Sequence, residues 1–279
     1  MKQLLGVSEA AYLRPLIYGL EASDSPYELL VDLPAETAIK LRERTRNLGC
    51  AFLSPIDYAR HGADYRIVPD VGVSSSSCTD TIQLFVNQGV RNIRSLSVDI
   101  RVTSEIILAK IVLIEKFPNL ASSGAEIRFV PMLPKLDEML AKADGALVVN
   151  FHPVHRSPEG LLALDLVDEW NDLTGLPYVH GFWVGHDNTE TEGIVPDLLR
   201  AKEEGLRHIE GIASQVAQRL TLPIDKAVEY FSSFSYKLGQ EEQEGLLEFI
   251  RYAFYHGVLP DVPDINFFEL DSSATPSVN

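Results

Sequence analysis

The alternation of short apolar segments with helical segments at the start of the chain most constrains its fold. Apolar and β-branched residues at Gln3–Val7 and Tyr27–Leu33 indicate strands, and Leu13–Leu20 and Pro34–Leu48 have helical patterns. Strands and helices that alternate at such short spacing are typical of parallel β-α units, in which helices cover a sheet. We therefore predict an α/β fold.

Strands continue through the middle of the chain, whereas the part beyond Gly185 has helical periodicity. The predicted strands are Cys50–Leu53, Thr81–Val86, Ser95–Asp99, Glu126–Val130, Gly145–Val149 and Tyr178–Val184. The predicted helices are Ile56–Arg60, Thr103–Phe117, Lys135–Lys142, Ile194–Leu220, Ile224–Ser232 and Glu241–His256. The polar run Ser74–Ser77 is predicted as a loop or as a hydroxyl-rich edge of a cleft.

This order of elements predicts two lobes with a ligand cleft between them. Lobe one would comprise residues 1–85 plus 185–270 and lobe two residues 86–184, followed by a flexible polar tail at 271–279. The chain would leave lobe one within 85–94 and return within 184–188. Two extended crossovers of this kind can act as a hinge around a bound molecule.

The charge balance limits the partners of the protein. The chain has 40 acidic and 24 basic residues, a formal net charge of -16. Nucleic acids and anionic membranes need a basic surface, so neither is expected as a partner. No apolar stretch approaches the roughly 20 residues of a membrane span, and the N-terminal sequence does not resemble a signal peptide, so we expect a cytoplasmic protein. The oligomeric state is left open.

Four segments carry a resemblance to a known family. They are Arg14–Leu20 (RPLIYGL), Ala143–Val149 (ADGALVV), Asp165–Val179 (DLVDEWNDLTGLPYV) and Gly245–Val258 (GLLEFIRYAFYHGV). In this order and spacing they resemble the chorismate dehydratases of the futalosine route to menaquinone, over nearly the whole chain. The resemblance implies a two-lobed fold like that of type II periplasmic binding proteins, with an interlobe cleft.

The resemblance also implies a reaction. Chorismate would lose water to give 3-[(1-carboxyvinyl)oxy]benzoate, so the protein would be a hydro-lyase that uses no metal and no organic cofactor. In this family the carboxylate of the substrate itself is a candidate base. The protein would then contribute positioning and electrostatic complementarity. The predicted partner is a small carboxylate such as chorismate.

Several positions depart from the pattern of the family. Tyr12 stands where the family usually has Asn, and Asn150 and Phe151 follow the strand where it usually has Gly-Asp. The helix start Asp99–Ser104 lacks an earlier Ser, and Thr81 replaces a Ser. Such a pocket leaves two alternatives open. The chain could be a non-catalytic soluble binding protein, or a divergent member that takes another small aromatic or carboxylate ligand.

The predicted substrate-binding residues share hydroxyl, amide or guanidinium groups suited to an anion. They are Tyr12, Arg14, Ser54, Thr81, Arg101, Thr103, Ser104 and Asn150. Thr103 and Ser104 precede an apolar helix, so they would cap it, cradle a carboxylate at its start, or both. Arg14 and Arg101 would grip a carboxylate with two hydrogen bonds or stay solvated at the surface.

Tyr12 and Asn150 are in addition the candidate catalytic groups. Tyr12 would donate its phenol to a ligand or pack as a core aromatic residue. Asn150 follows a buried strand, where it would meet a ligand or form a turn. His152 and His155 form an HxxH pattern with Asp165 beyond it, but Pro153 between them disfavours a helical pair. No metal site is predicted.

Overall fold

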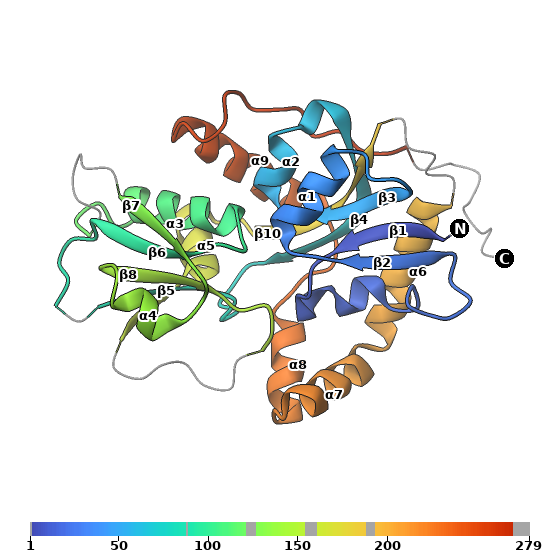
Figure 1. The fold of residues 1–279 in the computed structure, drawn as a ribbon, viewed down its shortest axis with the longest axis horizontal. Coiled ribbons are helices and arrows are strands. Elements are labelled where there is room, and N and C mark those ends of the chain that lie inside the picture. The colour runs from blue at the N-terminus through green and yellow to red at the C-terminus, as the bar shows by residue number, and fades with distance from the viewer. Residues whose placement is uncertain (1, 88, 121–126, 154–160, 188–192, 270–279) are drawn as a thin grey trace.

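The computed structural model describes residues 2–87, 89–120, 127–153, 161–187 and 193–269. The predicted tail at 271–279, His155 and residue 188 lie outside the described residues. Two lobes lie side by side, each built on its own five-stranded sheet (Figure 1). The predicted two-lobed α/β architecture is therefore confirmed.

The first sheet combines parallel β-α units with one long antiparallel strand. Its strand order is β2-β1-β3-β10-β4. β1 runs parallel to β2 and β3, whereas β10 runs antiparallel to β3 and β4. The bounds are β1 Gln3–Val7, β2 Tyr27–Val31, β3 Leu48–Leu53, β4 Tyr65–Ser75 and β10 Tyr178–His186. All nine residues of β10 are buried, so this strand forms the centre of the lobe.

The second sheet has the same mixed character. Its order is β7-β6-β8-β5-β9, with β6 parallel to β7 and β8, and β5 antiparallel to β8 and β9. The bounds are β5 Ile82–Val86, β6 Ser95–Asp99, β7 Arg128–Met132, β8 Gly145–Val149 and β9 Leu162–Asp165. Every residue of β5 and β6 is buried.

Helices cover both sheets, and local signals explain where several begin. They are η1 Ala11–Ile17, α1 Pro34–Arg42, α2 Pro55–Ala59, η2 Gly62–Asp64, α3 Ser104–Glu115, α4 Leu136–Leu140, α5 Leu166–Thr174, α6 Ile194–Arg207, α7 Ile209–Leu220, α8 Ile224–Ser232 and α9 Gln240–Tyr255. Pro34 and Pro55 occupy the first positions of α1 and α2, where a missing N–H costs nothing. The Asp165 side chain caps α5, and Gly175, at φ 71°, ends it.

The sheet pairing corrects the predicted lobe boundaries. The boundary at 85/86 falls inside β5, which pairs with β8 and β9 of the second sheet. The boundary at 184/185 falls inside β10, which pairs with β3 and β4 of the first sheet. The chain therefore crosses between the sheets at 76–81 and again at 175–177. An apolar strand pattern does not specify the sheet in which the strand pairs, because distant segments decide the pairing.

Helix α9 of the first lobe contacts the second lobe beside the return crossover. Trp170 of α5 is fully buried and packs edge-on against Phe249 and Tyr252 of α9, with ring centroids 5.7 Å apart in both pairs. The Trp170 indole N–H donates to the Pro177 carbonyl at 3.3 Å. The lobes are thus joined by packed aromatic side chains as well as by the crossovers.

Candidate functional site

A chain of hydroxyl hydrogen bonds links the two lobes where α2 and α3 begin. The Ile56 N–H donates to Ser104 Oγ at 3.0 Å, and Ser104 Oγ donates to Ser54 Oγ at 2.9 Å. Ser54 Oγ in turn donates to Asp57 Oδ2 at 2.7 Å, and the Thr103 side chain also bonds Asp57. We use the name interlobe seam for these hydrogen bonds among Ser54, Ile56, Asp57, Thr103 and Ser104, together with the hydrogen bond between Ala11 and Phe151 that is described below.

The seam uses residues in a way that differs from simple helix capping. Thr103 occupies the N-cap position of α3, but its side chain reaches Asp57 of the first lobe instead of capping the helix. Burial raises the pKa of Asp57, and the hydrogen bonds from Ser54 and Thr103 oppose that rise. The predicted sites Ser54, Thr103 and Ser104 are therefore brought together, and Asp57 joins them.

Glu105 fills the helix start that was predicted to hold a ligand carboxylate. Its carboxyl group accepts hydrogen bonds from the backbone N–H groups of Thr103 and of Glu105 itself. Burial, followed by the nearby Asp57 and Asp99 carboxylates, raises the pKa of Glu105 to about 7. The anion cradle at α3 is thus occupied by the protein's own carboxyl group, and a ligand role for Thr103 and Ser104 stays a prediction.

Tyr12 is buried on the first-lobe side of the seam. Its ring lies 5.5 Å from that of His180 and 5.3 Å from that of Phe234, centroid to centroid. Burial and the nearby Glu105 carboxyl raise the pKa of the Tyr12 phenol, and burial lowers the pKa of His180 to about 3. Both side chains are therefore uncharged near neutral pH, so the Tyr12 hydroxyl can donate a hydrogen bond but does not supply a phenolate base.

Arg101 and Phe151 form a compact pair on the second-lobe side. The Arg101 guanidinium bonds both carboxylate oxygens of Asp99, with Nη2 to Oδ2 at 2.6 Å, and donates to the Val149 carbonyl at 3.1 Å. It also lies 4.5 Å from the centroid of the Phe151 ring. The Ala11 N–H of the first lobe donates to the Phe151 carbonyl at 2.6 Å. Arg101 would have to release Asp99 before it could grip a ligand with two hydrogen bonds.

Asn150 and Thr81 lie next to each other where β8 ends and β5 begins. The Asn150 N–H donates to the Thr81 carbonyl at 2.7 Å, and its side-chain amide donates to the Asp80 carbonyl at 2.7 Å. The Thr81 hydroxyl is hydrogen-bonded to that of Thr79. Both predicted residues thus support the first crossover, and their contact with a ligand stays a prediction.

Arg14 lies apart from the other predicted residues, in a pocket of about 510 Å³ at the edge of the interlobe seam. We call it the mouth pocket; its lining is Val7, Ser8, Glu9, Ala10, Arg14, Ile17, Glu21, Leu29, Val31, His152, Arg219 and Leu220. It opens at the carboxyl ends of the parallel strands β1 and β2, the usual position of ligands in such sheets. His152 comes from the second lobe, so the pocket spans both.

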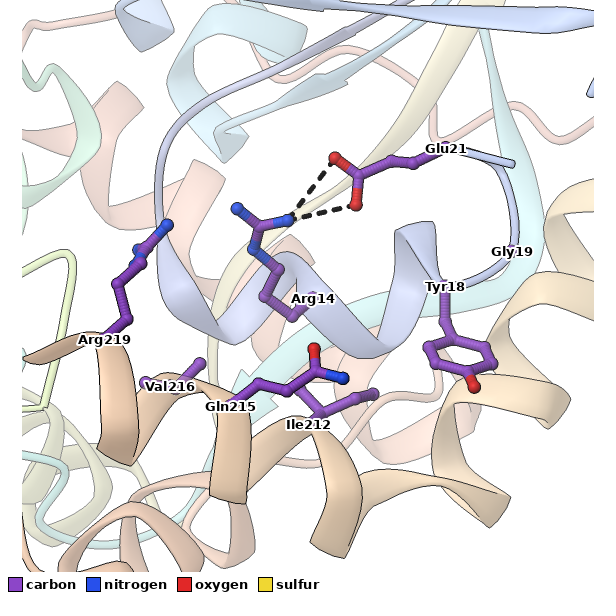
Figure 2. Close-up of a pocket in the computed structure, with 8 residues that line it drawn as sticks. All are labelled: Arg14, Tyr18, Gly19, Glu21, Ile212, Gln215, Val216 and Arg219. Carbon is purple, nitrogen blue, oxygen red and sulfur yellow. Dashed lines mark hydrogen bonds and ion pairs between the residues drawn. The ribbon is translucent and has the colours of Figure 1, made fainter. Parts of the chain in front are cut away.

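The Arg14 guanidinium is already paired inside this pocket. Its Nη1 atom lies 3.0 Å from Oε2 and 3.4 Å from Oε1 of Glu21. Figure 2 shows an adjoining pocket of about 300 Å³ that shares Arg14, Glu21 and Arg219. Arg14 and Arg219 rise from η1 and α7 with their guanidinium groups pointing the same way (Figure 2).

Sequence reasoning missed Asp57, Glu105 and Arg219. Asp57 had a detectable signal, because Ser54 and Asp57 have the spacing of a helix-capping pair. Arg219 had none, because only the packing of α7 near η1 brings it to the pocket.

Asp165, considered above as a third metal ligand, has a structural role. Its carboxylate accepts from the Thr79 N–H at 3.1 Å, the Asp80 N–H at 2.8 Å and the Gln83 amide at 2.8 Å, and it caps α5. Cys78, Asp80 and Asp165 place ligand atoms within 4.8 Å of one another. Because Asp165 is already occupied by N–H donors, we assign no ion to this cluster.

Two mixed five-stranded sheets, joined by two crossovers, define the class of periplasmic-binding-protein-like folds. Protein AF1704 from Archaeoglobus fulgidus superposes with a TM-score of 0.70 at 16% identity, covering 92% of this chain and 98% of its own. The periplasmic aliphatic sulphonate binding protein SsuA from Escherichia coli gives a TM-score of 0.62 at 10% identity, covering 95% of each chain. These similarities establish the fold.

Sequence comparison then specifies the family. A family model described as menaquinone biosynthesis matches residues 4–255, so the chain belongs to this menaquinone biosynthesis family. Chorismate dehydratase from Thermus thermophilus is 24% identical over 264 residues, which cover 88% of this chain and 93% of the relative. The predicted family resemblance is confirmed. Among the described residues, no helix is both long and apolar enough to cross a membrane.

Proposed function

We propose that this protein is a chorismate dehydratase-like lyase of menaquinone biosynthesis, which converts chorismate into 3-[(1-carboxyvinyl)oxy]benzoate. The observation that carries the proposal is the match to the family over residues 4–255, with a curated chorismate dehydratase aligned over 93% of its length. We further propose that the reaction takes place between the lobes, in the cytoplasm, and without metal or organic cofactor.

The reaction breaks one C–O bond and one C–H bond of the substrate ring. The departing hydroxyl group and the ring proton leave as water, and the electron pair of the C–H bond completes the aromatic ring. Aromatisation supplies the driving force, so the main task of the protein is to hold the substrate with its leaving groups aligned. The hydroxyl groups and buried carboxyl groups of the interlobe seam offer directional contacts for this task.

Tyr12 and Asn150 remain the candidate catalytic groups in this proposal. Tyr12 follows Ala11, which bonds the second lobe, and Asn150 bonds the first crossover. A modest separation of the lobes would therefore expose both side chains to the ring of a bound substrate. The Tyr12 phenol would act as a hydrogen-bond donor because it stays protonated near neutral pH. The base would then be the substrate's own carboxylate, as in the reaction that the family resemblance implies.

A direct assay tests the proposal. Purified protein is incubated with chorismate, with and without a chelator, and the aromatic product is followed by chromatography. We expect product well above the spontaneous rate and unchanged by the chelator. Loss of activity with chelator would contradict metal-free catalysis. A folded protein that forms no product above the spontaneous rate would contradict the enzymatic function.

One observation supports a second candidate function, that of a non-catalytic binding protein. Tyr12 and Phe151 replace smaller or charged residues expected from the family pattern, and both are buried at the seam. Rings at these positions reduce the space for a substrate between the lobes. Binding of chorismate or of its benzoate product, detected by a thermal shift without turnover, would favour this alternative.

A further inference from the structure

Two buried carboxyl groups, one from each lobe, lie beside each other at the interlobe seam. Asp57 of α2 and Glu105 of α3 belong to different lobes (Figure 1), and each residue is only 7% exposed. Thr103 bonds both of them, because its side chain bonds the Asp57 carboxylate and its backbone N–H donates to Glu105. The seam therefore holds two acids from opposite lobes on either side of one residue.

These two carboxyl groups differ from the other buried acids in having no ion pair. Four carboxyl side chains are buried among the residues that the structure describes: Asp57, Asp99, Glu105 and Glu242. Asp99 pairs with Arg101 at 2.6 Å. Glu242 pairs with Lys237 at 3.5 Å. Within the same described residues Asp57 and Glu105 form no ion pair, and their hydrogen bonds come from hydroxyl and N–H groups. If both are ionised, they repel each other where little water screens the charge.

The titratable groups around the two acids leave this repulsion in place. They are Tyr12 of η1, Arg60 and His61 after α2, Tyr65 of β4, Asp99 of β6 with its partner Arg101, and Tyr178 of β10. Arg60 and His61 favour the charged form of Asp57, whereas Asp99 opposes the charged form of Glu105. The three phenols are neutral near pH 7, because burial raises the pKa of each.

The charged groups where α5 and α9 pack on α3 lie at the other end of that helix, about three turns from Glu105. They are Lys110, Glu115, Lys116, Glu169, Asp172 and His256, and they bond one another. The state of Glu105 is therefore set at the seam.

Protonation of Glu105 decides whether the two acids repel each other. Burial and the nearby Asp57 and Asp99 carboxylates raise the pKa of Glu105 to about 7, and burial raises the pKa of Asp57. Below this pH the joined seam holds Glu105 without charge. Separation of the lobes would let water reach both acids and return the pKa of Glu105 toward its usual 4.5.

We propose that Asp57 and Glu105 form a pH-dependent latch, which keeps the lobes joined while Glu105 carries a proton and favours their separation when both acids are ionised. The joined seam holds a proton that the separated lobes release, so the ratio of separated to joined molecules rises with pH. The rise is up to about ten-fold per pH unit between pH 4.5 and pH 7, and it levels off above pH 7. The latch depends on the seam and not on the proposed reaction.

Hydrogen exchange of backbone amides, measured by NMR on the full-length protein, reports this separation. The N–H groups of Ala11 and Ile56 donate across the seam at 2.6 and 3.0 Å, so they exchange when the lobes part. The N–H groups of Leu4 and Ile93 donate within one lobe at 2.8 and 2.7 Å and serve as references. Protection factors, corrected for the intrinsic effect of pH on exchange, are compared between pH 5 and pH 8.

The variants are Glu105→Gln, Asp57→Asn and the double substitution, with Glu210→Gln on the exposed side of α7 as the matched control. In the wild type and the control, protection of Ala11 and Ile56 should fall together up to pH 7 while the references hold. Glu105→Gln should abolish this fall. Asp57→Asn should move it to lower pH, and the double variant should behave like Glu105→Gln because the two acids act as a pair.

Three results would overturn the latch. They are wild-type protection that does not change with pH, the same pH dependence in Glu105→Gln as in the wild type, and a fall at Ile56 without one at Ala11. If Glu105→Gln does not fold, Asp57→Asn decides, and an unchanged pH dependence in that variant rejects the proposal. The experiment needs no substrate, so a protein that parts its lobes with pH but does not convert chorismate keeps the latch and loses the proposed reaction.

Discussion

Glu105 combines burial with a position at the start of a helix, and the two effects oppose each other. The backbone N–H groups at the start of α3 favour its charged form, whereas burial and the nearby Asp57 and Asp99 carboxylates disfavour it. Burial is the larger effect, so the pKa of Glu105 rises to about 7. A carboxyl group with this pKa exchanges its proton near neutral pH and makes the seam sensitive to pH.

The stability of the protein should therefore contain a component that depends on Glu105. Between the usual glutamate pKa of about 4.5 and the folded value of about 7, the folded protein holds a proton that the unfolded chain has released. Stability is then lost as pH rises through this window. Glu105→Gln should remove the loss, and its stability relative to the wild type should rise by about 2–3 kcal/mol between pH 4.5 and pH 8.

Urea unfolding at a series of pH values checks this expectation. Glu210→Gln, at an exposed position in the first turn of α7, is the matched control for loss of a carboxyl group. A difference between Glu105→Gln and the wild type that stays constant across this pH range would show that burial does not perturb Glu105.

Tyr12→Asn introduces the residue that the family pattern has at this position. It removes the ring that contacts His180 and Phe234 and leaves a polar amide in a buried site. We expect a loss of about 3 kcal/mol in the free energy of unfolding, measured with urea. Tyr255→Asn, at a residue that is 77% exposed, should change stability by less than about 0.5 kcal/mol. Similar effects of the two substitutions would contradict a packing role for Tyr12.

At the scale of elements, α9 approaches the return crossover so closely that one position of the helix requires glycine. A Cβ atom on Gly245 would lie 2.3 Å from the Pro177 carbonyl oxygen, which is fixed backbone. The contact lies next to the packing of Trp170 on α9, so the helix would have to move away from both the crossover and α5.

Gly245→Ala should destabilise the protein by about 2–4 kcal/mol, although alanine is the better helix former. Gly211→Ala is the matched control, because a Cβ atom on Gly211 of α7 meets nothing within 4 Å. That substitution should raise stability by about 0.5–1 kcal/mol. Thermal or urea unfolding measures the stability change of each variant. If Gly245→Ala stabilises the protein, α9 can move away from the Pro177 carbonyl at little cost and the close contact does not require glycine.

Local patterns predicted elements well where the pattern was unbroken. β1, β5, β6 and β8 match the predicted strands closely, because β1, β5 and β8 are mainly apolar and β6 alternates polar with apolar residues. β4 was missed because Pro69 and Asp70 resemble a turn. Asp70 adopts φ 58° inside the strand, and Lys202, distant in sequence, bonds its carboxylate at 2.7 Å.

The predicted helix over 194–220 is two helices, α6 and α7, that meet at His208. The His208 ring stacks on Tyr18 at 4.8 Å and bonds the Glu204 carbonyl at 2.8 Å. The apolar repeat continues through this point, so periodicity alone gave no sign of the break.

The candidate site was predictable only where a local sequence pattern marks its residues. Hydroxyl residues beside helix starts carry a local signal, and Ser54, Thr103 and Ser104 do meet at the seam. The sequence has no local signal for which lobe supplies a partner. It therefore could not show that Thr103 reaches across to Asp57, or that Arg219 lies beside Arg14.

At the scale of the whole molecule, net charge acts against an anionic ligand before local contacts form. The formal charge of -16 repels a dianion such as chorismate at long range. This repulsion extends about 30 Å at 0.01 M salt but only about 8 Å at 0.15 M salt. The association rate for chorismate should therefore rise several-fold over this range, the reverse of the behaviour of a basic protein.

Stopped-flow measurement of intrinsic tryptophan fluorescence gives this rate. Trp170 of α5 and Trp183 of β10 are buried in the two elements that flank the return crossover, so their emission should respond to ligand binding between the lobes. A rate that falls with added salt would show that the local field of the arginine residues outweighs the net charge.

The central claim is that an organic carboxylate binds between the two lobes. A crystal structure of the protein grown with 3-[(1-carboxyvinyl)oxy]benzoate tests it most directly. We predict density for this molecule between η1 and the residues that follow β8, in contact with both lobes. Density confined to one lobe, or an empty interlobe region in crystals with the compound in excess, would contradict the claim.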